Sequence, residues 1–122
     1  MERTFVMLGA ALAFLGVALG AFGAHALGPR LDARDLEIFE TGVRYQMYHA
    51  LALVLVGWAM TRWPGGGTVV AGWAFLIGVV VFSGSLYLLV LTGTRGWGAV
   101  TPLGGVAFLV GWAALVWRLA RG

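Results

Sequence analysis

Apolar residues fill four long stretches of the chain, and short polar segments separate these stretches. The stretches cover roughly residues 4–26, 41–62, 68–92 and 102–120. Each has the ~20 residues that a helix needs to cross the hydrocarbon core of a bilayer. Because backbone groups surrounded by lipid must form hydrogen bonds within their own segment, the stretches are predicted to be membrane-spanning helices.

Helix-breaking residues lie between the predicted spans. Gly28 and Pro29 follow the first span, "RWPGGG" ends the second and "TGTRGWG" follows the third. Connections this short place consecutive helices antiparallel. We therefore expect residues 1–122 to form a single all-α domain, an antiparallel up-down-up-down bundle of four transmembrane helices.

Two positions carry signals for the start of a helix. Asp32 is expected to cap a helix that runs through "DARDLEIFETGVRYQ" into the second span. Thr101 before Pro102 is expected to cap the fourth span. The first span also carries a ladder of small residues at four-residue spacing, which is typical of close packing between membrane helices: Gly16, Gly20 and Ala24.

The first stretch has two interpretations. Its basic start, apolar centre and Ala24-His25-Ala26 ending resemble a secretory signal sequence. Its length is that of a membrane span, and we interpret it as a first membrane helix.

The composition agrees with a membrane protein. Hydrophobic residues make up 61% of the 122 residues and charged residues 11%. A soluble domain of this length buries too little surface to hide so many apolar side chains. The chain has no cysteine, which excludes disulfides and thiolate metal sites. Its basic residues are scattered arginines, so no nucleic-acid interface is expected.

The arginines are divided equally between the two sides of the predicted bundle. Arg3, Arg62, Arg118 and Arg121 lie on the side of the termini, whereas Arg30, Arg34, Arg44 and Arg95 lie on the other side. The positive-inside rule counts basic residues and therefore gives a tie. We expect both termini in the cytoplasm and a homo-oligomer, and the tie also permits dual topology.

Polar side chains of all four predicted spans gather in the half of the bundle away from the termini. Counting from Arg62 at ~1.5 Å per residue across a ~30 Å core places Arg44 at the membrane boundary and His49 roughly 9 Å inside. Polar groups at such depth usually face the bundle interior or a cavity. We predict a one-sided ligand-binding site centred on His49, with these candidate residues: His25, Arg44, Tyr45, Gln46, His49, Ser83, Ser85 and Tyr87.

The same residues also have a structural interpretation. His49 would form a hydrogen bond between helices, for example to Ser83 or Ser85, and such bonds contribute ~1 kcal/mol. His25 at a helix end suits the helix dipole. Arg44 would extend to water at the boundary, and tyrosines are common at membrane interfaces.

Four motifs occur in order along the chain: "GAFGAHAL" (20–27), "YQMYHALAL" (45–53), "FSGSLY" (82–87) and "TPLGG" (101–105). They resemble the domain-of-unknown-function 423 / transmembrane protein 256 family of small integral membrane proteins. The resemblance covers nearly the whole chain and implies a four-helix protein of the bacterial inner membrane, without an established activity. This chain has Ala26 where the family usually has a glycine after the first histidine.

Three functions fit these observations. A polar chamber centred on His49 would bind or transport a small amphiphile, a lipid head group or an ion. No acidic residue lies deep in a span, so His49 would have to carry any coupled proton. Alternatively, the glycine-rich faces would make the chain a structural or assembly protein. A haem or metal protein would use His25 and His49 as ligands.

No enzymatic activity is expected. The sequence contains no set of nucleophile, base and orienting residue and no nucleotide-binding loop. No catalytic residue, metal site or cofactor is therefore assigned. The expected partners are the lipid bilayer and further copies of the chain, and the sequence does not identify another protein partner.

Overall fold

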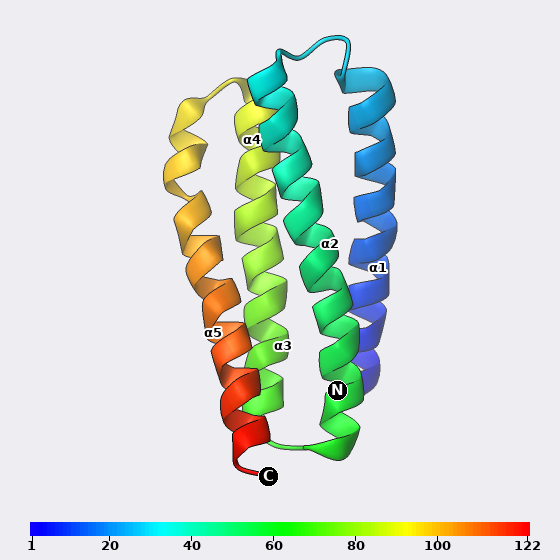
Figure 1. Ribbon diagram of the computed structural model, residues 1–122, viewed down its shortest axis with the longest axis vertical. Coiled ribbons are helices and arrows are strands. Elements are labelled where there is room, and N and C mark those ends of the chain that lie inside the picture. Colours follow the sequence, from blue (N-terminus) through cyan, green and yellow to red (C-terminus); the bar gives the residue numbers. More distant parts are fainter.

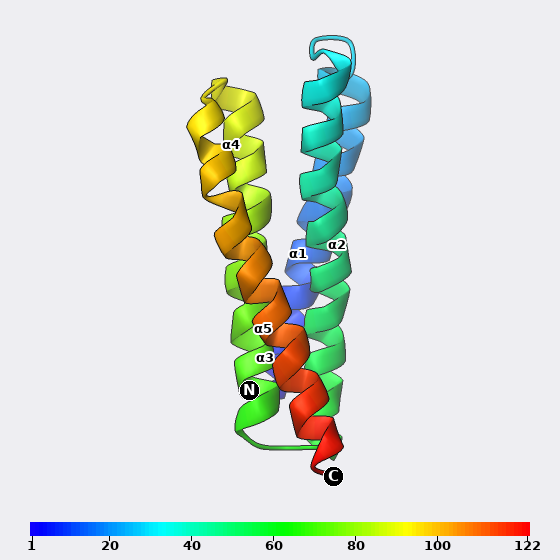
Figure 2. The same cartoon turned by 60° about the vertical axis from the view of Figure 1, so that its left-hand side comes forward.

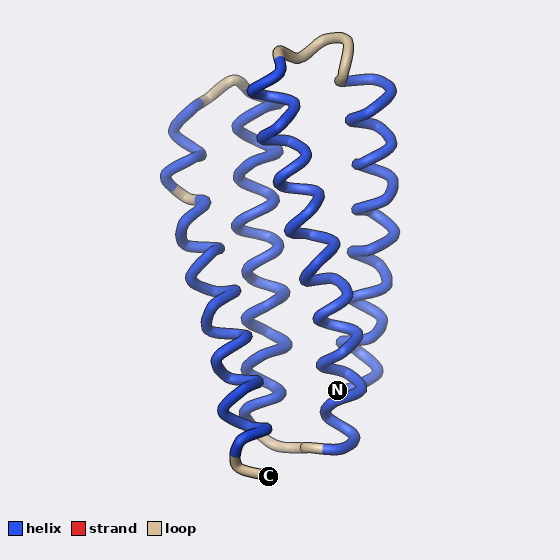
Figure 3. Tube along the Cα trace, viewed as in Figure 1, coloured by secondary structure: helices blue, strands red, loops and turns tan.

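The chain folds into helices that run alternately up and down, as Figure 1 shows. The computed structural model describes residues 1–122 and contains, in order, α1 (Glu2–Phe22), η1 (Gly23–Leu27), α2 (Ala33–Arg62), α3 (Gly66–Gly78), η2 (Val79–Ser83), α4 (Gly84–Thr92), η3 (Arg95–Ala99) and α5 (Thr101–Ala120). The segments η1 and η2 are π-helical turns, and η3 is a 3-10 turn. No strand is present, so the all-α prediction is confirmed (Figure 3).

The π-helical turns continue their neighbouring helices, so the chain forms four rods. α1 packs along α2, and α5 packs along the rod α3–η2–α4, which also contacts α2. Figures 1 and 2 both show these two pairs side by side. The termini and residues 63–65 lie at one end, called here the terminal end, and residues 28–32 and 93–94 lie at the opposite loop end (Figure 1).

Three of the four rods are long and apolar enough to cross a membrane. They are Glu2–Leu27, Gly66–Thr92 and Arg95–Ala120. The α2 helix has 30 residues, but its first half contains the charged and polar side chains of "ARDLEIFETGVRYQ". Three of the predicted spans agree with this result, and the span over residues 41–62 stays a prediction.

The two expected helix caps have different outcomes. Asp32 caps α2, because its Oδ1 accepts a hydrogen bond of 2.8 Å from the Asp35 N–H. The expectation that Thr101 caps the last helix is wrong, because Val100 holds that position and no side chain caps α5. The Thr101 hydroxyl is instead within 2.5 Å of the Ser85 hydroxyl. The turn η3 already leads the backbone into α5, so the side chain is available for a contact between helices.

The buried apolar side chains form two clusters with a polar layer between them. The larger cluster occupies the half nearer the terminal end and includes Phe5, Leu53 and Phe75. The smaller one, near the loop end, consists of Phe39, Leu89 and Val90. Of the five buried polar residues, Thr68 lies at the start of α3, and the other four lie between these clusters along α2 and the rod α3–η2–α4: Gln46, His49, Ser83 and Ser85.

Glycines allow the rods to approach closely. The predicted ladder on α1 faces α2 in part, because Gly16 lies against Met47 and Gly20 lies against Val43. Gly104 on α5 lies directly against the backbone of Phe82 in η2. A side chain at Gly104 would therefore separate α5 from the π-helical turn.

We expect Gly104→Ala to destabilise the fold by about 1–3 kcal/mol, the usual cost of overpacking. The new methyl group would lie 2.7 Å from Phe82 Cα, a backbone atom that cannot move aside cheaply. Thermal unfolding in detergent, followed by circular dichroism, measures the effect. Gly105→Ala is the matched control, because no atom lies within 4 Å of a Cβ there. Equal melting temperatures for the two variants would contradict the predicted clash.

Candidate functional site

His49 is buried on α2 and is only 5% exposed. Its Nδ1 lies 2.8 Å from the carbonyl oxygen of Tyr45, and its Nε2 lies 3.0 Å from Nε1 of Trp112 on α5. A carbonyl only accepts and an indole N–H only donates, so the contacts select the neutral tautomer with a proton on Nδ1. Both ring nitrogens of His49 are therefore engaged within the protein.

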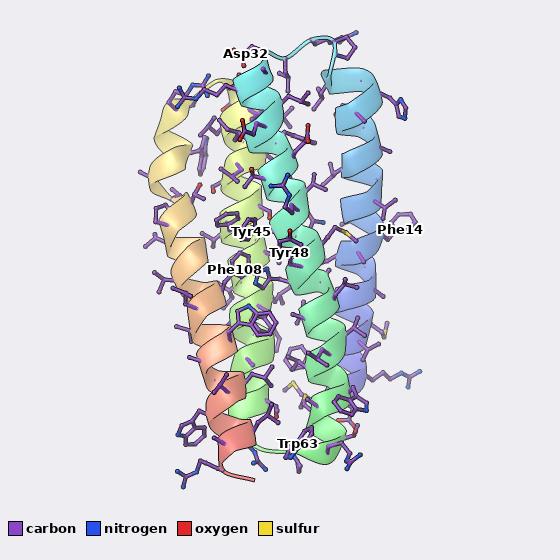
Figure 4. All side chains as sticks on the ribbon, in the orientation of Figure 1. Phe14, Asp32, Tyr45, Tyr48, Trp63 and Phe108 are labelled. Atoms are coloured by element: carbon purple, nitrogen blue, oxygen red, sulfur yellow. The ribbon has the colours of Figure 1, made fainter.

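Aromatic rings surround this histidine. The imidazole is stacked on Phe108 with ring centroids 3.6 Å apart and an interplanar angle of 7°. Phe75 on α3 lies 5.5 Å away and Tyr45 lies 6.3 Å away, between ring centroids. Figure 4 shows Tyr45 and Phe108 close together between α2 and α5. His49 thus joins α2 to α5 through one hydrogen bond and a ring stack.

Gln46 joins three helices in a second group. Its amide Nε2 donates to the carbonyl oxygen of Leu12 on α1 at 2.8 Å. Its Oε1 accepts from the hydroxyl of Tyr87 on α4 at 2.6 Å. Gln46 is 3% exposed, so both hydrogen bonds satisfy amide atoms that water hardly reaches.

Neither serine of "FSGSLY" forms a hydrogen bond with His49. The Ser83 hydroxyl donates to the carbonyl oxygen of Gly42 on α2 at 2.6 Å. The Ser85 hydroxyl lies 2.8 Å from the carbonyl oxygen of Phe82, and it forms a second hydrogen bond with the Thr101 hydroxyl. The expected hydrogen bond from His49 to one of these serines is wrong, because Trp112 supplies the donor instead.

The remaining candidates lie at the surface. The side chains of His25, Arg44 and Tyr45 are exposed. His25 lies on η1, beyond α1, whereas His49 is buried against α5, so the structure does not bring the two histidines together. No cluster of three or more histidine, cysteine or acidic side chains has the arrangement of a metal site.

The candidate residues thus form separate groups and not one open chamber. No buried side-chain nitrogen or oxygen lacks a hydrogen-bond partner. None of the surface grooves is lined by His49. One groove, of about 330 Å³ between α1, α2 and the rod α3–η2–α4, is bordered by Gln46, Ser83 and Tyr87. The arrangement can hold helices together, and at this groove it can contact the apolar part of a ligand.

Sequence reasoning missed Trp112 and Phe108 as partners of His49. A usable signal was present for Trp112, since it lies 11 residues after Thr101, well inside the fourth predicted span. An indole N–H at that depth needs an acceptor within the protein. Phe108 carries no polar atom and gives no comparable signal.

We expect Trp112→Phe to lower the stability by about 1 kcal/mol, because His49 Nε2 loses its only donor while an aromatic ring is retained. The melting temperature in detergent measures the loss. Trp97→Phe is the control, since Trp97 lies in η3 and its side chain forms no hydrogen bond with another residue. The same melting temperature for Trp112→Phe and wild type would refute a stabilising role for this bond.

Comparisons with known proteins match this chain to members of one family. A family model described as "Protein of unknown function (DUF423)" matches residues 19–105. The "UPF0382 membrane protein YwdK" of Bacillus subtilis (strain 168) is 48% identical over 115 residues, which cover 93% of this chain and 94% of that protein. The "UPF0382 inner membrane protein YgdD" of Escherichia coli (strain K12) is 42% identical over 117 residues, covering 95% and 89%. No solved structure matches significantly.

Proposed function

Since this chain belongs to the DUF423 family and is an integral protein of the inner membrane, we propose that it is a non-enzymatic, four-span structural protein that acts through its outer helix faces. One observation carries the proposal: every buried side-chain nitrogen and oxygen has a hydrogen-bond partner. A binding chamber would keep some polar groups available for its ligand. Here the internal polar groups join the helices, and the surface is left for interactions with lipid or other proteins.

Membrane insertion of α2 is part of this proposal. It is supported by the kinds of side chain that this helix exposes and buries. The exposed apolar side chains of its second half recur at helical spacing: Tyr48, Leu51, Leu55 and Trp58. Gln46 and His49 lower the mean hydropathy of the helix, but both side chains are buried in the bundle. The surface that α2 would present to lipid is therefore apolar, and Arg44 can extend toward water.

Four spans require the N- and C-termini to lie on the same side of the membrane, and three spans would put them on opposite sides. We expect reporter tags at both termini to be accessible from the same side, with the cytoplasm as the expected side. Protease or labelling access in sealed inner-membrane vesicles measures this. A cysteine at Arg30 should be labelled from the opposite side, and the chain has no native cysteine to interfere. Termini on opposite sides would exclude membrane insertion of α2 as a span.

The outer face of α1 is the surface best suited to a second copy of the chain. Only 17% of its most apolar window is buried, against 22% for Arg95–Ala120 and 50% for Gly66–Thr92. A shallow groove runs along it between Ala10, Ala13 and Ala18, beside Phe14 and Val17. Small side chains allow the backbones of membrane helices to approach closely. We therefore propose a homo-oligomer that associates through α1.

A single cysteine on this face tests the association. We expect Ala13→Cys to form a disulfide-linked dimer in native membranes under mild oxidation. Leu109→Cys is the control on α5: Leu109 is apolar and more exposed than the half-buried Ala13, so non-specific collisions would favour its cross-linking. No dimer for Ala13→Cys, or equal dimer for both variants, would rule out α1 as a specific interface.

Ligand binding in the polar half is the second candidate, and the groove beside Gln46 favours it. Leu12, Leu15 and Leu19 line the groove on α1, so it fits the acyl chain of a small amphiphile. Gly84→Leu would fill this groove, since no atom lies within 4 Å of a Cβ there. Native mass spectrometry of wild type, Gly84→Leu and His49→Ala would reveal the ligand as extra mass. Bound mass that Gly84→Leu loses would favour the groove, and loss in His49→Ala alone would favour the predicted centre.

A further inference from the structure

An open groove of about 630 Å³ lies at the terminal end, between the start of α3 and the end of α5. This volume is in the usual range for small-molecule sites. The residues that line it combine small, apolar and cationic side chains, among them Gly66, Val70, Trp117, Arg118 and Arg121. The groove shares no residue with the polar layer around Gln46 and His49.

Two arginines face this groove without a carboxylate partner. The only ion pairs of the chain are Met1–Glu2 and Arg95–Asp35. Arg118 donates from Nε to the carbonyl oxygen of Pro64 at 3.0 Å, which orients its guanidinium at the groove. The guanidinium carbon of Arg121 lies 4.9 Å from the ring centroid of Trp117. Both cations are therefore held in position while most of their N–H donors remain available.

Two glycines give the groove its shape. A Cβ at Gly67 would lie 2.6 Å from Cβ of Arg118, so the glycine allows the stem of this arginine to lie against α3. No atom lies within 4 Å of a Cβ at Gly66, which leaves open space beside the arginines. A ligand group can therefore enter at Gly66 without displacing a side chain.

The groove lies where two candidate membrane spans end. Gly66–Thr92 begins at this groove, and Arg95–Ala120 finishes at it. Val70 and Trp117 extend the lining toward the apolar part of both spans. Tryptophan is typical of the level of the lipid head groups. This position depends on α3 and α5 and is independent of whether α2 crosses the membrane.

The charges at the two ends differ. The terminal end carries Arg3, Arg62, Arg118 and Arg121 with a single acidic residue, Glu2, whereas the four remaining acidic residues accompany the four arginines of the loop end. An anionic ligand is therefore favoured at the terminal end. The Coulomb attraction of arginines near a membrane surface acts on anionic lipids in particular.

We propose that the groove between α3 and α5 binds the phosphate of an anionic phospholipid. Arg118 and Arg121 donate hydrogen bonds to the phosphate oxygens, in the manner typical of guanidinium groups. Val70 and Trp117 contact the glycerol and the first part of an acyl chain. The site goes beyond the proposed structural function, because it would fix the protein to a particular class of lipid.

Titration of the detergent-solubilised protein with phosphatidylglycerol, followed by native mass spectrometry, tests the site. We expect Arg121→Gln to weaken lipid binding about fivefold, the effect of one arginine near an anionic lipid. Gly66→Leu should weaken it at least as much, because the leucine fills the space for the phosphate. Arg62→Gln is the matched control: Arg62 lies at the same end and over a tryptophan, Trp63, but outside the groove.

The outcomes separate the alternatives. Weakening in Arg121→Gln and Gly66→Leu, with little change in Arg62→Gln, supports the site. Equal weakening in Arg121→Gln and Arg62→Gln would overturn it in favour of general attraction between charges. Displacement of the lipid by millimolar inorganic phosphate would show a site for free phosphate and overturn the assignment to a lipid. If Gly66→Leu fails to fold, Arg121→Gln still decides, because the side chain of Arg121 is exposed and forms no hydrogen bond within the protein.

Discussion

The interior of this protein depends on hydrogen bonds that connect α2 to each of the other rods. A polar group without a partner in the hydrocarbon core costs several kcal/mol, so every donor there must find an acceptor within the protein. The α2 helix supplies the carbonyl oxygen of Gly42, the amide of Gln46 and the imidazole of His49. Leu12, Ser83, Tyr87 and Trp112 supply the partners from α1, η2, α4 and α5. Sliding any rod along α2 would break such a bond, so the bonds fix the register of the bundle.

The π-helical turn η2 makes these contacts geometrically possible. Phe75, Val79, Ser83 and Tyr87 are spaced by four residues, and in a regular α-helix such positions drift around the axis because a turn has 3.6 residues. A π-helical turn contains more residues and compensates for the drift. Phe75, Val79 and Ser83 are therefore all buried, and Tyr87 still reaches Gln46. The same turn is held against α5 by the contact between Gly104 and Phe82.

These details explain which parts of the structure could be predicted from the sequence. The fixed rise of a helix makes depth predictable, so the sequence places Gln46, His49, Ser83 and Ser85 in one half of the bundle. The rotation of each helix about its axis is harder to predict, because a π-helical turn leaves no clear sequence signal. Partners across the bundle depend on that rotation, and His49 consequently pairs with Trp112 and not with a serine. The contact of Thr101 with Ser85 is equally hard to predict, since it depends on how α4 faces α5, and the sequence pattern favours a cap instead.

The difference between the depth of a residue and the side of the helix on which it lies also matters for the membrane insertion of α2. Mean hydropathy averages over all sides of a helix and so counts Gln46 and His49 as if they faced lipid. Both side chains are buried and hydrogen-bonded, so the cost of placing them in hydrocarbon is already met within the bundle. The exposed side chains of residues 48–60 are Tyr48, Leu51, Leu55 and Trp58. The relevant quantity for insertion is therefore the polarity of the exposed face, which over the second half of α2 is apolar up to Trp58, whereas the first half exposes Glu37, Glu40 and Arg44.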